Sequence, residues 1–227
     1  MVEPRLYFRQ IEIGPMQNFT YLIGDPISRE AAVVDAAWDI PAIVRVAAQD
    51  GFTITKALVT HYHQDHLGGD FSGFHIQGAA ELLEHVKAKV YINKAEAPFL
   101  GRLAGLAKSD IVQVESGDTT TVGNITVTFI HTPGHTPGSQ CFLIENRLVA
   151  GDTLFINSCG RVDLPGSNPE DMYYSLQRLA KLPDETVLYP GHNYADKPCA
   201  TLAEQKRHNM YLRLSLRNLS DFLAVMG

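Results

Sequence analysis

The chain has 227 residues, of which 45% are hydrophobic and 19% charged, and its formal net charge at pH 7 is −6. This composition supports a sizeable buried core and excludes an intrinsically disordered chain. The acidic balance and the lack of any lysine or arginine run argue against a nucleic-acid partner. No apolar stretch reaches the roughly 18 residues that a membrane-spanning helix requires, so we expect no membrane association.

Cysteine usage and the first residues indicate the compartment. The three cysteines, Cys141, Cys159 and Cys199, are far apart and odd in number, which is typical of reduced thiols. The opening residues lead into an alternating pattern and not into the apolar segment of a secretion signal. We therefore expect a cytoplasmic protein that forms one domain over residues 1–227, ending in a short helical tail.

The first half of the chain is predicted to contain strands separated by helices. Strands are expected over residues 6–13, 19–23, 31–34, 54–60 and 89–92. A helix is expected from its N-cap Asp39 to Gly51, because Pro41 lies in the first turn and apolar residues recur at helical spacing. Residues 79–86 and 95–107 are also predicted to be helical.

The second half repeats this plan. Strands are expected over residues 111–114, 125–130, 140–144, 147–150 and 186–188. Asn168 is predicted to cap a helix that continues to about Lys181, because a proline and two acidic residues follow it directly. The segment 201–204 has the capping-box pattern that opens a last helical region.

A dense group of metal-ligand side chains follows the predicted strand 54–60. His61, His63, Asp65 and His66 lie within six residues and are followed by two glycines. Alternate residues of an extended segment point the same way, so His61 and His63 can face one metal while Asp65 and His66 reach a second. A single loop histidine is usually just solvated, but four such side chains this close would repel one another without a cation.

Three more candidate ligands follow predicted strands. His135 lies in a loop rich in proline and glycine after strand 125–130, Asp152 follows strand 147–150, and His192 follows strand 186–188. Loops at the carboxyl ends of strands gather ligand-bearing residues in open α/β architectures. His75 and His85 belong to no cluster and are expected to have surface or packing roles.

This ordered set resembles the metallo-β-lactamase-fold superfamily, over nearly the whole chain. The resemblance implies an α/β fold, a four-layer αββα sandwich with the metal site along an edge where the two sheets meet. It also implies two divalent metal ions, zinc or iron. The first would be held by His61, His63 and His135 and the second by Asp65, His66 and His192, with Asp152 bridging them.

The same resemblance implies a metal-dependent hydrolase. A hydroxide shared by the two ions would attack the substrate carbonyl, with Asp65 and Asp152 as the carboxylates of the catalytic centre. A thiolate leaving group would depart without strong acid assistance, which suits a thioester substrate. A metal-storing or interaction protein with this fold is the other class considered, and the complete ligand set argues against it.

The substrate class is indicated by a second motif. The segment 157–163 resembles the Gly-Cys-Gly-Arg/Lys segment of glyoxalase II and of the related persulfide dioxygenases. By that match Arg161 would bind a carboxylate of a glutathione-like tail, with Tyr194 hydrogen-bonding to it; a surface ion pair for Arg161 and simple packing for Tyr194 are equally compatible with the sequence. Cys159 is expected to be a packed residue.

Several activities therefore stay open. The main hypothesis is glyoxalase II-like cleavage of a thioester or related ester of a small molecule, such as a glutathione conjugate. Long glyoxalase II enzymes have a C-terminal helical domain, which we expect to be missing here or cut to a short helical tail, and Asp163 stands near the place of a glutathione-binding aromatic. The alternatives are a persulfide dioxygenase with one iron on His61, His135 and Asp152, and a lactonase. A homodimer is compatible with the sequence.

Overall fold

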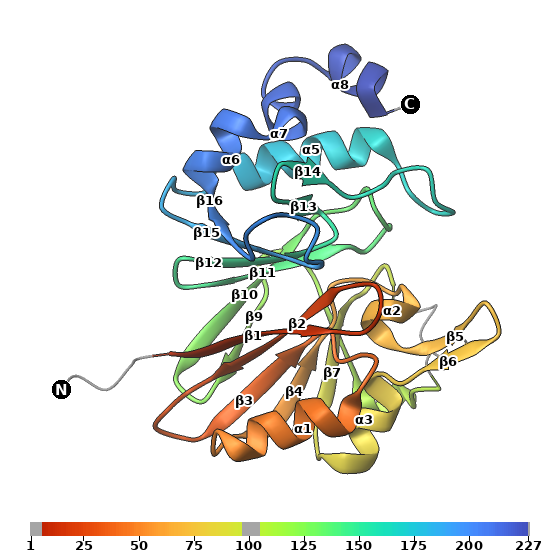
Figure 1. The fold of residues 1–227 in the computed structure, drawn as a ribbon, viewed down its shortest axis with the longest axis vertical. Coiled ribbons are helices and arrows are strands. Elements are labelled where there is room, and N and C mark those ends of the chain that lie inside the picture. Colours follow the sequence, from red (N-terminus) through yellow and green to blue (C-terminus); the bar gives the residue numbers. More distant parts are fainter. Residues whose placement is uncertain (1–5, 97–104, 227) are drawn as a thin grey trace.

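The computed structural model describes residues 6–96 and 105–226. Two six-stranded sheets face each other, and helices cover the outer face of each (Figure 1). This is the four-layer αββα sandwich that the sequence predicted. In the part of the chain described, no helix is long and apolar enough to cross a membrane.

The first sheet is built from the N-terminal half of the chain. Its strand order is β1, β2, β3, β4, β7, β8. β1, β2 and β3 pair antiparallel, and from β3 onward each strand is parallel to the next. The bounds are Tyr7–Ile13 (β1), Asn18–Gly24 (β2), Glu30–Val34 (β3), Thr53–Leu58 (β4), Lys89–Asn93 (β7) and Ile111–Val114 (β8).

The second sheet is built from the C-terminal half, in the order β16, β15, β12, β11, β10, β9. All its neighbours are antiparallel except β12 and β15. The bounds are Thr119–Val122 (β9), Ile125–His131 (β10), Gln140–Ile144 (β11), Arg147–Gly151 (β12), Val187–Pro190 (β15) and Ala200–Thr201 (β16). Two small hairpins lie outside the sheets: Gly69–Phe71 (β5) with Phe74–Ile76 (β6), and Leu154–Phe155 (β13) with Ser158–Cys159 (β14).

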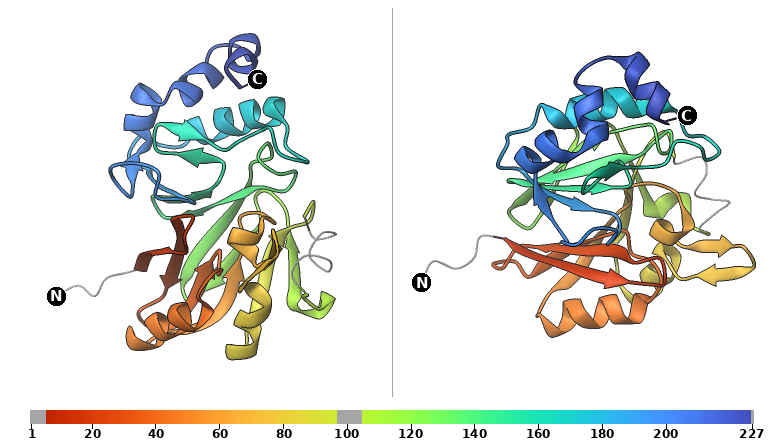
Figure 2. Two further views of the ribbon diagram at one scale, coloured as in Figure 1. Left: turned by 45° about the vertical axis from the view of Figure 1, so that its right-hand side comes forward. Right: turned by 45° about the horizontal axis from the view of Figure 1, so that its top comes forward.

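The sandwich has three apolar layers. Between the sheets, Tyr21, Phe129 and Phe142 are among the largest fully buried side chains. Helices α1 (Ile40–Gln49) and α3 (Ala79–His85) cover the first sheet. The second sheet is covered by α5 (Pro169–Ala180), α6 (Leu202–His208), α7 (Met210–Ser215) and α8 (Leu219–Met226), as both views of Figure 2 show.

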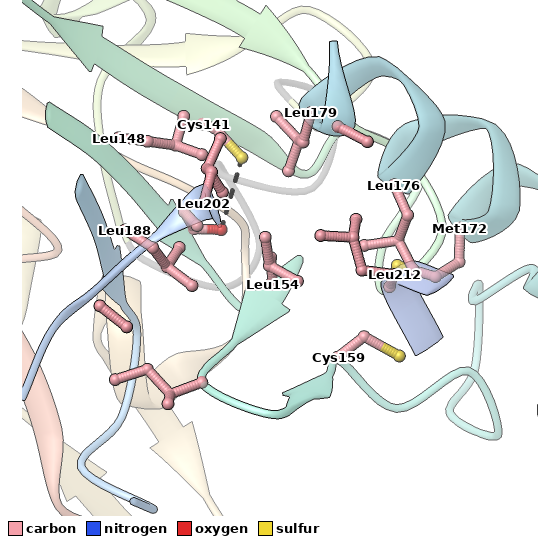
Figure 3. Close-up of a cluster of buried hydrophobic side chains, with 14 of the residues drawn as sticks. Cys141, Leu148, Leu154, Cys159, Met172, Leu176, Leu179, Leu188, Leu202 and Leu212 are labelled. Carbon is pink, nitrogen blue, oxygen red and sulfur yellow. Dashed lines mark hydrogen bonds between the residues drawn. The ribbon is translucent and has the colours of Figure 1, made fainter. Parts of the chain in front are cut away.

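The outer layer on the second sheet is a leucine-rich cluster (Figure 3). Leu176 and Leu179 of α5 reach toward Leu148 and Leu188 of the sheet, and all four are fully buried. Cys141 is buried in the same cluster, where its thiol donates to the carbonyl of Ala150 at 3.5 Å. Burying one leucine side chain contributes on the order of 2 kcal/mol, so this cluster fixes the helices to the sheet.

The helix starts follow the predicted caps. Asp39 accepts from the amide of Ala42 at 2.9 Å, and Asn168 accepts from two amides of the first turn of α5. Thr201 and Glu204 form the predicted capping box of α6. These side chains satisfy amides that have no partner within the helix, which fixes where each helix begins.

The elements that differ between the sequence prediction and the structure are mostly short or polar. The sequence reading missed β9, because its threonine-rich segment lacks the apolar pattern of a buried strand. It also missed β16 and both hairpins, whose strands have only two or three residues. For the helix predicted over 95–107, Ala95 and Glu96 lie in a turn and 105–107 have no regular structure, while residues 97–104 lie outside the described part.

Candidate metal centre

All seven predicted ligands meet at one edge of the sandwich. His61, His63, Asp65 and His66 lie on the loop after β4 and on the one-turn helix α2 (Gln64–Leu67). The second sheet supplies the other three from loops that follow β10, β12 and β15: His135, Asp152 and His192. A bridge between Asn18 and His192 joins the two sheets beside them. His135, Asp152 and His192 therefore lie where the sequence placed them, after strand ends, and the other four side chains follow β4 as predicted.

One group of donors consists of His61, His63 and His135. The Nδ1 atom of His63 lies 3.1 Å from His61 Nε2 and 3.0 Å from His135 Nε2. His61 and His135 are buried. Three imidazole nitrogens thus converge on one point from two different loops.

A second group consists of Asp65, His66 and His192. The Nε2 atoms of His66 and His192 are 3.2 Å apart, and they lie 3.3 and 3.4 Å from Asp65 Oδ2. Both histidines are buried. This group has the mixed imidazole and carboxylate character that zinc and iron accept.

The Asp152 carboxylate lies between the two groups. Its Oδ2 is 3.6 Å from His135 Nε2 and 3.4 Å from His192 Nε2, while Oδ1 is 3.4 Å from His66 Nε2. Oδ1 is buried and, among the described residues, has no hydrogen-bond partner. A buried carboxylate oxygen without a donor is costly, and a cation at this point would satisfy it.

The separations between donors fit a metal site. Four ligands at the usual zinc–nitrogen distance of about 2.0–2.1 Å in a tetrahedron are about 3.3 Å from one another. His63 Nδ1 lies 3.0–3.1 Å from the other two nitrogens of its group, and the three donor atoms of the second group are 3.2–3.4 Å apart. Imidazole lone pairs that face each other this closely are unfavourable unless a proton or a metal ion lies between them, so the donor set fits a metal.

Asp35 holds two of the histidines in place. Its carboxylate accepts from the amide and the hydroxyl of Thr60 at 2.8 and 2.7 Å and from His66 Nδ1 at 3.0 Å. Because the Thr60 hydroxyl donates to Asp35, its oxygen accepts from His61 Nδ1 at 3.0 Å. Both rings are thereby fixed with Nε2 toward the metal groups.

Backbone carbonyls orient two more rings. His135 Nδ1 donates to the carbonyl of Arg161 at 2.8 Å, and His192 Nδ1 donates to that of Met16 at 2.9 Å. Asn18 donates to Asp65 Oδ2 at 2.9 Å and accepts from the indole of Trp38 at 3.0 Å. These contacts orient the His135 and His192 rings so that the Nε2 atom of each can bind a metal ion. They also fix the Asp65 carboxylate in a position from which it can act as a ligand.

Asp35 and Asn18 were missed by the sequence reading. Asp35 has a signal in retrospect, since it directly follows a buried apolar strand, as Asp152 does. It also adopts φ 51°, a conformation that aspartate tolerates better than most residues. Asn18 has no local signal, because its partners lie 20 and 47 residues away.

The protonation of the two groups differs in the absence of a metal. Burial holds the pKa of His61 well below its ordinary value and lowers that of His63 to about 4. Burial also opposes the charged form of His192, but hydrogen bonds to Asp152 and Asp65 raise its pKa to about 9. His61 and His63 are thus neutral and ready to ligate, whereas a metal must displace a proton from His192.

A pocket of about 440 Å³ opens over these donors. Arg161 and Tyr194, the two residues predicted to bind substrate, both line it. Tyr194 stacks on His192 with ring centroids 4.7 Å apart, and burial raises its pKa to about 12, so its hydroxyl stays protonated. The Arg161 guanidinium makes two hydrogen bonds to Asp163, at 2.9 and 2.8 Å, so its charge is already paired.

Glu96 is a buried carboxyl group behind the metal loops. It is fully buried, and its Oε1 accepts from the hydroxyl of Thr136 and, at 3.0 Å, from the amide of Gly138. Its Oε2 has no hydrogen-bond partner among the described residues. Burial raises the pKa of Glu96 to about 7, more than the hydrogen bonds lower it. Glu96 therefore ties down the loop that carries His135.

We expect Glu96→Gln to change how stability depends on pH. Between its ordinary pKa of 4.5 and about 7, Glu96 ionises in the unfolded chain but stays protonated in the folded one. Glu96 therefore lowers the unfolding free energy of the wild type by about 3 kcal/mol over this interval, a contribution that the variant lacks. Urea unfolding of the metal-free proteins at several pH values measures the difference.

The exposed Glu84 on α3 offers a matched control, since Glu84→Gln should leave the wild-type pH dependence unchanged. Parallel pH profiles for the wild type and Glu96→Gln would contradict a neutral, buried Glu96 side chain.

The chain belongs to the metallo-beta-lactamase superfamily, whose family model matches residues 13–192. It has the fold and the His/Asp cluster of the metal-dependent hydrolases of that superfamily. The probable polyketide biosynthesis zinc-dependent hydrolase BaeB of Bacillus velezensis is 31% identical over 199 residues, which are 87% of this chain and 82% of that protein.

Two other kinds of relative are similar. The hydroxyacylglutathione hydrolase of Maricaulis maris is 37% identical over 183 residues, and the match spans 79% of this chain but only 63% of that protein. The human mitochondrial persulfide dioxygenase ETHE1 is 31% identical over 92% of this chain and 76% of its own length. The crystal structure of ETHE1 from Myxococcus xanthus matches with a TM-score of 0.82 and 32% identity, over 97% of this chain and 89% of that one.

Proposed function

We propose that this protein is a binuclear metal-dependent hydrolase that cleaves a thioester or a related ester of a small molecule. The observation that carries this proposal is the position of Asp152. Its carboxylate contacts histidines of both donor groups, and its Oδ1 is buried without a hydrogen-bond donor in the described part of the chain. A carboxylate placed in this way suits two neighbouring ions.

The donor set defines which residues would hold each ion. His61, His63 and His135 would hold the first; the second would be held by Asp65, His66 and His192, with Asp152 shared. When bound, such ions lower the pKa of a coordinated water toward about 7 and polarise a carbonyl group.

The protein's own side chains would orient the substrate. The protonated Tyr194 can donate a hydrogen bond to a substrate in the pocket, because burial raises its pKa to about 12. Asp65 is fixed by Asn18, and burial of His61, His66, His135 and His192 keeps bulk water from their rings. A thiolate leaving group would depart without a strong acid, which these residues do not supply.

A mononuclear iron persulfide dioxygenase is the second candidate. The structural similarity to ETHE1 from Myxococcus xanthus favours it. Two histidines and one carboxylate form the facial triad of many iron oxygenases, and His61, His135 and Asp152 would supply one here. A lactonase would use the same donors on a cyclic ester and is distinguished from both by its substrate.

We expect the metal-loaded protein to hydrolyse thioesters in the absence of oxygen. The assay compares cleavage of S-lactoylglutathione under anaerobic conditions with oxygen uptake on glutathione persulfide, each with zinc-loaded and iron-loaded protein. Hydrolysis with either metal and no oxygen uptake supports the hydrolase. Iron-dependent oxygen consumption, without thioester cleavage under either metal, would assign the dioxygenase instead.

A further inference from the structure

The walls of the pocket above the metal donors are mostly apolar. Besides the donors themselves, several apolar and aromatic side chains line it, from the turn between β1 and β2, the loops after β4 and β15, the hairpin β5–β6, β13 and the loop before α5. These are Met16, Tyr62, Phe71, Phe155, Leu164, Pro165 and Tyr194. A volume of about 440 Å³ is in the range of pockets that bind small organic ligands.

Three of these side chains form an exposed rim. Met16 is 37% exposed, Phe71 46% and Tyr194 61%. Phe71 stands on the hairpin β5–β6, which projects from the body of the molecule in Figures 1 and 2. Large apolar side chains gathered at the mouth of a functional pocket indicate that an apolar ligand covers them.

Positive charge in the pocket is already paired. Arg161 is the one lysine or arginine among the described residues that line it. Asp163 binds its guanidinium in a bidentate pair, and both side chains are mostly exposed to solvent. An anionic tail would have to compete with Asp163, so a charged carrier such as glutathione gains little here.

We propose that the site selects esters or thioesters whose acyl group is an apolar chain or ring, carried on a small uncharged thiol or alcohol. The inference rests on the proposed hydrolase function and names its substrate class. The acyl chain lies against Phe71, Met16 and Phe155, with its carbonyl at the metal donors. Each methylene group of the acyl chain that is buried against these side chains should raise the affinity about threefold to fourfold.

Binding can be tested without turnover. The probes are S-alkyl thioethers of N-acetylcysteamine, from ethyl to octyl, titrated calorimetrically into zinc-loaded protein, which cannot hydrolyse them, beside the matching S-alkylglutathiones. We expect affinity to rise about threefold per methylene until the pocket is filled, and the glutathione series to bind no tighter at equal chain length. Affinity that depends on the glutathione part and not on chain length would overturn the inference.

The hairpin supplies a matched pair of variants. Phe71→Ala should flatten the dependence on chain length, because Phe71 lines the pocket. Phe74 pairs with Phe71 across the hairpin, is 76% exposed and is not among the residues that line the pocket. Phe74→Ala should therefore leave the dependence of affinity on chain length unchanged. Equal effects of both substitutions would contradict a wall role for Phe71.

Turnover separates this inference from the proposed function. Zinc-loaded protein is assayed on N-acetylcysteamine thioesters from acetyl to octanoyl and on S-lactoylglutathione. A rise of kcat/KM with acyl length supports the substrate class. A preference for S-lactoylglutathione with no effect of acyl length overturns the substrate class and keeps the hydrolase. Chain-length-dependent binding without hydrolysis of any thioester overturns the hydrolase alone.

Discussion

Replacing Asp152 with alanine is expected to lower kcat by on the order of 10³-fold, whereas Arg161→Ala should leave kcat nearly unchanged and raise KM at most severalfold. Asp152 contacts donors of both groups, so its loss disturbs both ion positions. Arg161 is exposed and already paired with Asp163, so it can contribute only ground-state binding.

Steady-state kinetics at saturating thioester, with metal content measured in parallel, check this result. Asp163→Asn is an informative control, because it frees the Arg161 guanidinium without touching the metal donors. This substitution should improve KM for anionic thioesters and leave kcat unchanged. Loss of kcat in Arg161→Ala, together with an active Asp152→Ala protein, would show that the two roles are assigned wrongly.

Metal removal is expected to have the second large effect. With free metal about 1,000-fold above its dissociation constant, each ion adds about 4 kcal/mol to the stability of the folded state. For a chain of this size, that raises the melting temperature by about 10 °C per ion. Chelation should therefore lower the melting temperature and abolish turnover, and zinc or iron should restore both.

Elemental analysis of metal-replete protein should find about two ions per chain, on the two-metal pattern. His192→Ala should bind one, because His192 belongs only to the second group. His85→Ala, at the exposed end of α3, is the control for adventitious binding and should bind two. A wild type that holds one ion, with the group of Asp65, His66 and His192 empty, would contradict the binuclear proposal.

Much of the fold follows from local pattern. The long apolar strands and the helices capped by Asp39, Asn168 and Thr201 lie where the sequence predicts, because burial and capping depend on neighbouring residues. The strand β9 and the two-residue strands β13 and β14 were not predicted. β9 pairs with β10 without an apolar pattern of its own, and β13 and β14 are too short for their residues to form a recognisable pattern.

By itself, the sequence predicted the class of fold and the candidate ligand set, because His61, His63, Asp65 and His66 lie within one short motif and the other three candidate ligands follow predicted strands. Only the tertiary structure decided what surrounds them. Asp35 supports His66 across 31 residues, and Glu96 meets Thr136 across 40. The apolar rim is likewise assembled from separate turns and hairpins. Such contacts have no local pattern, because packing of the two sheets brings the partners together.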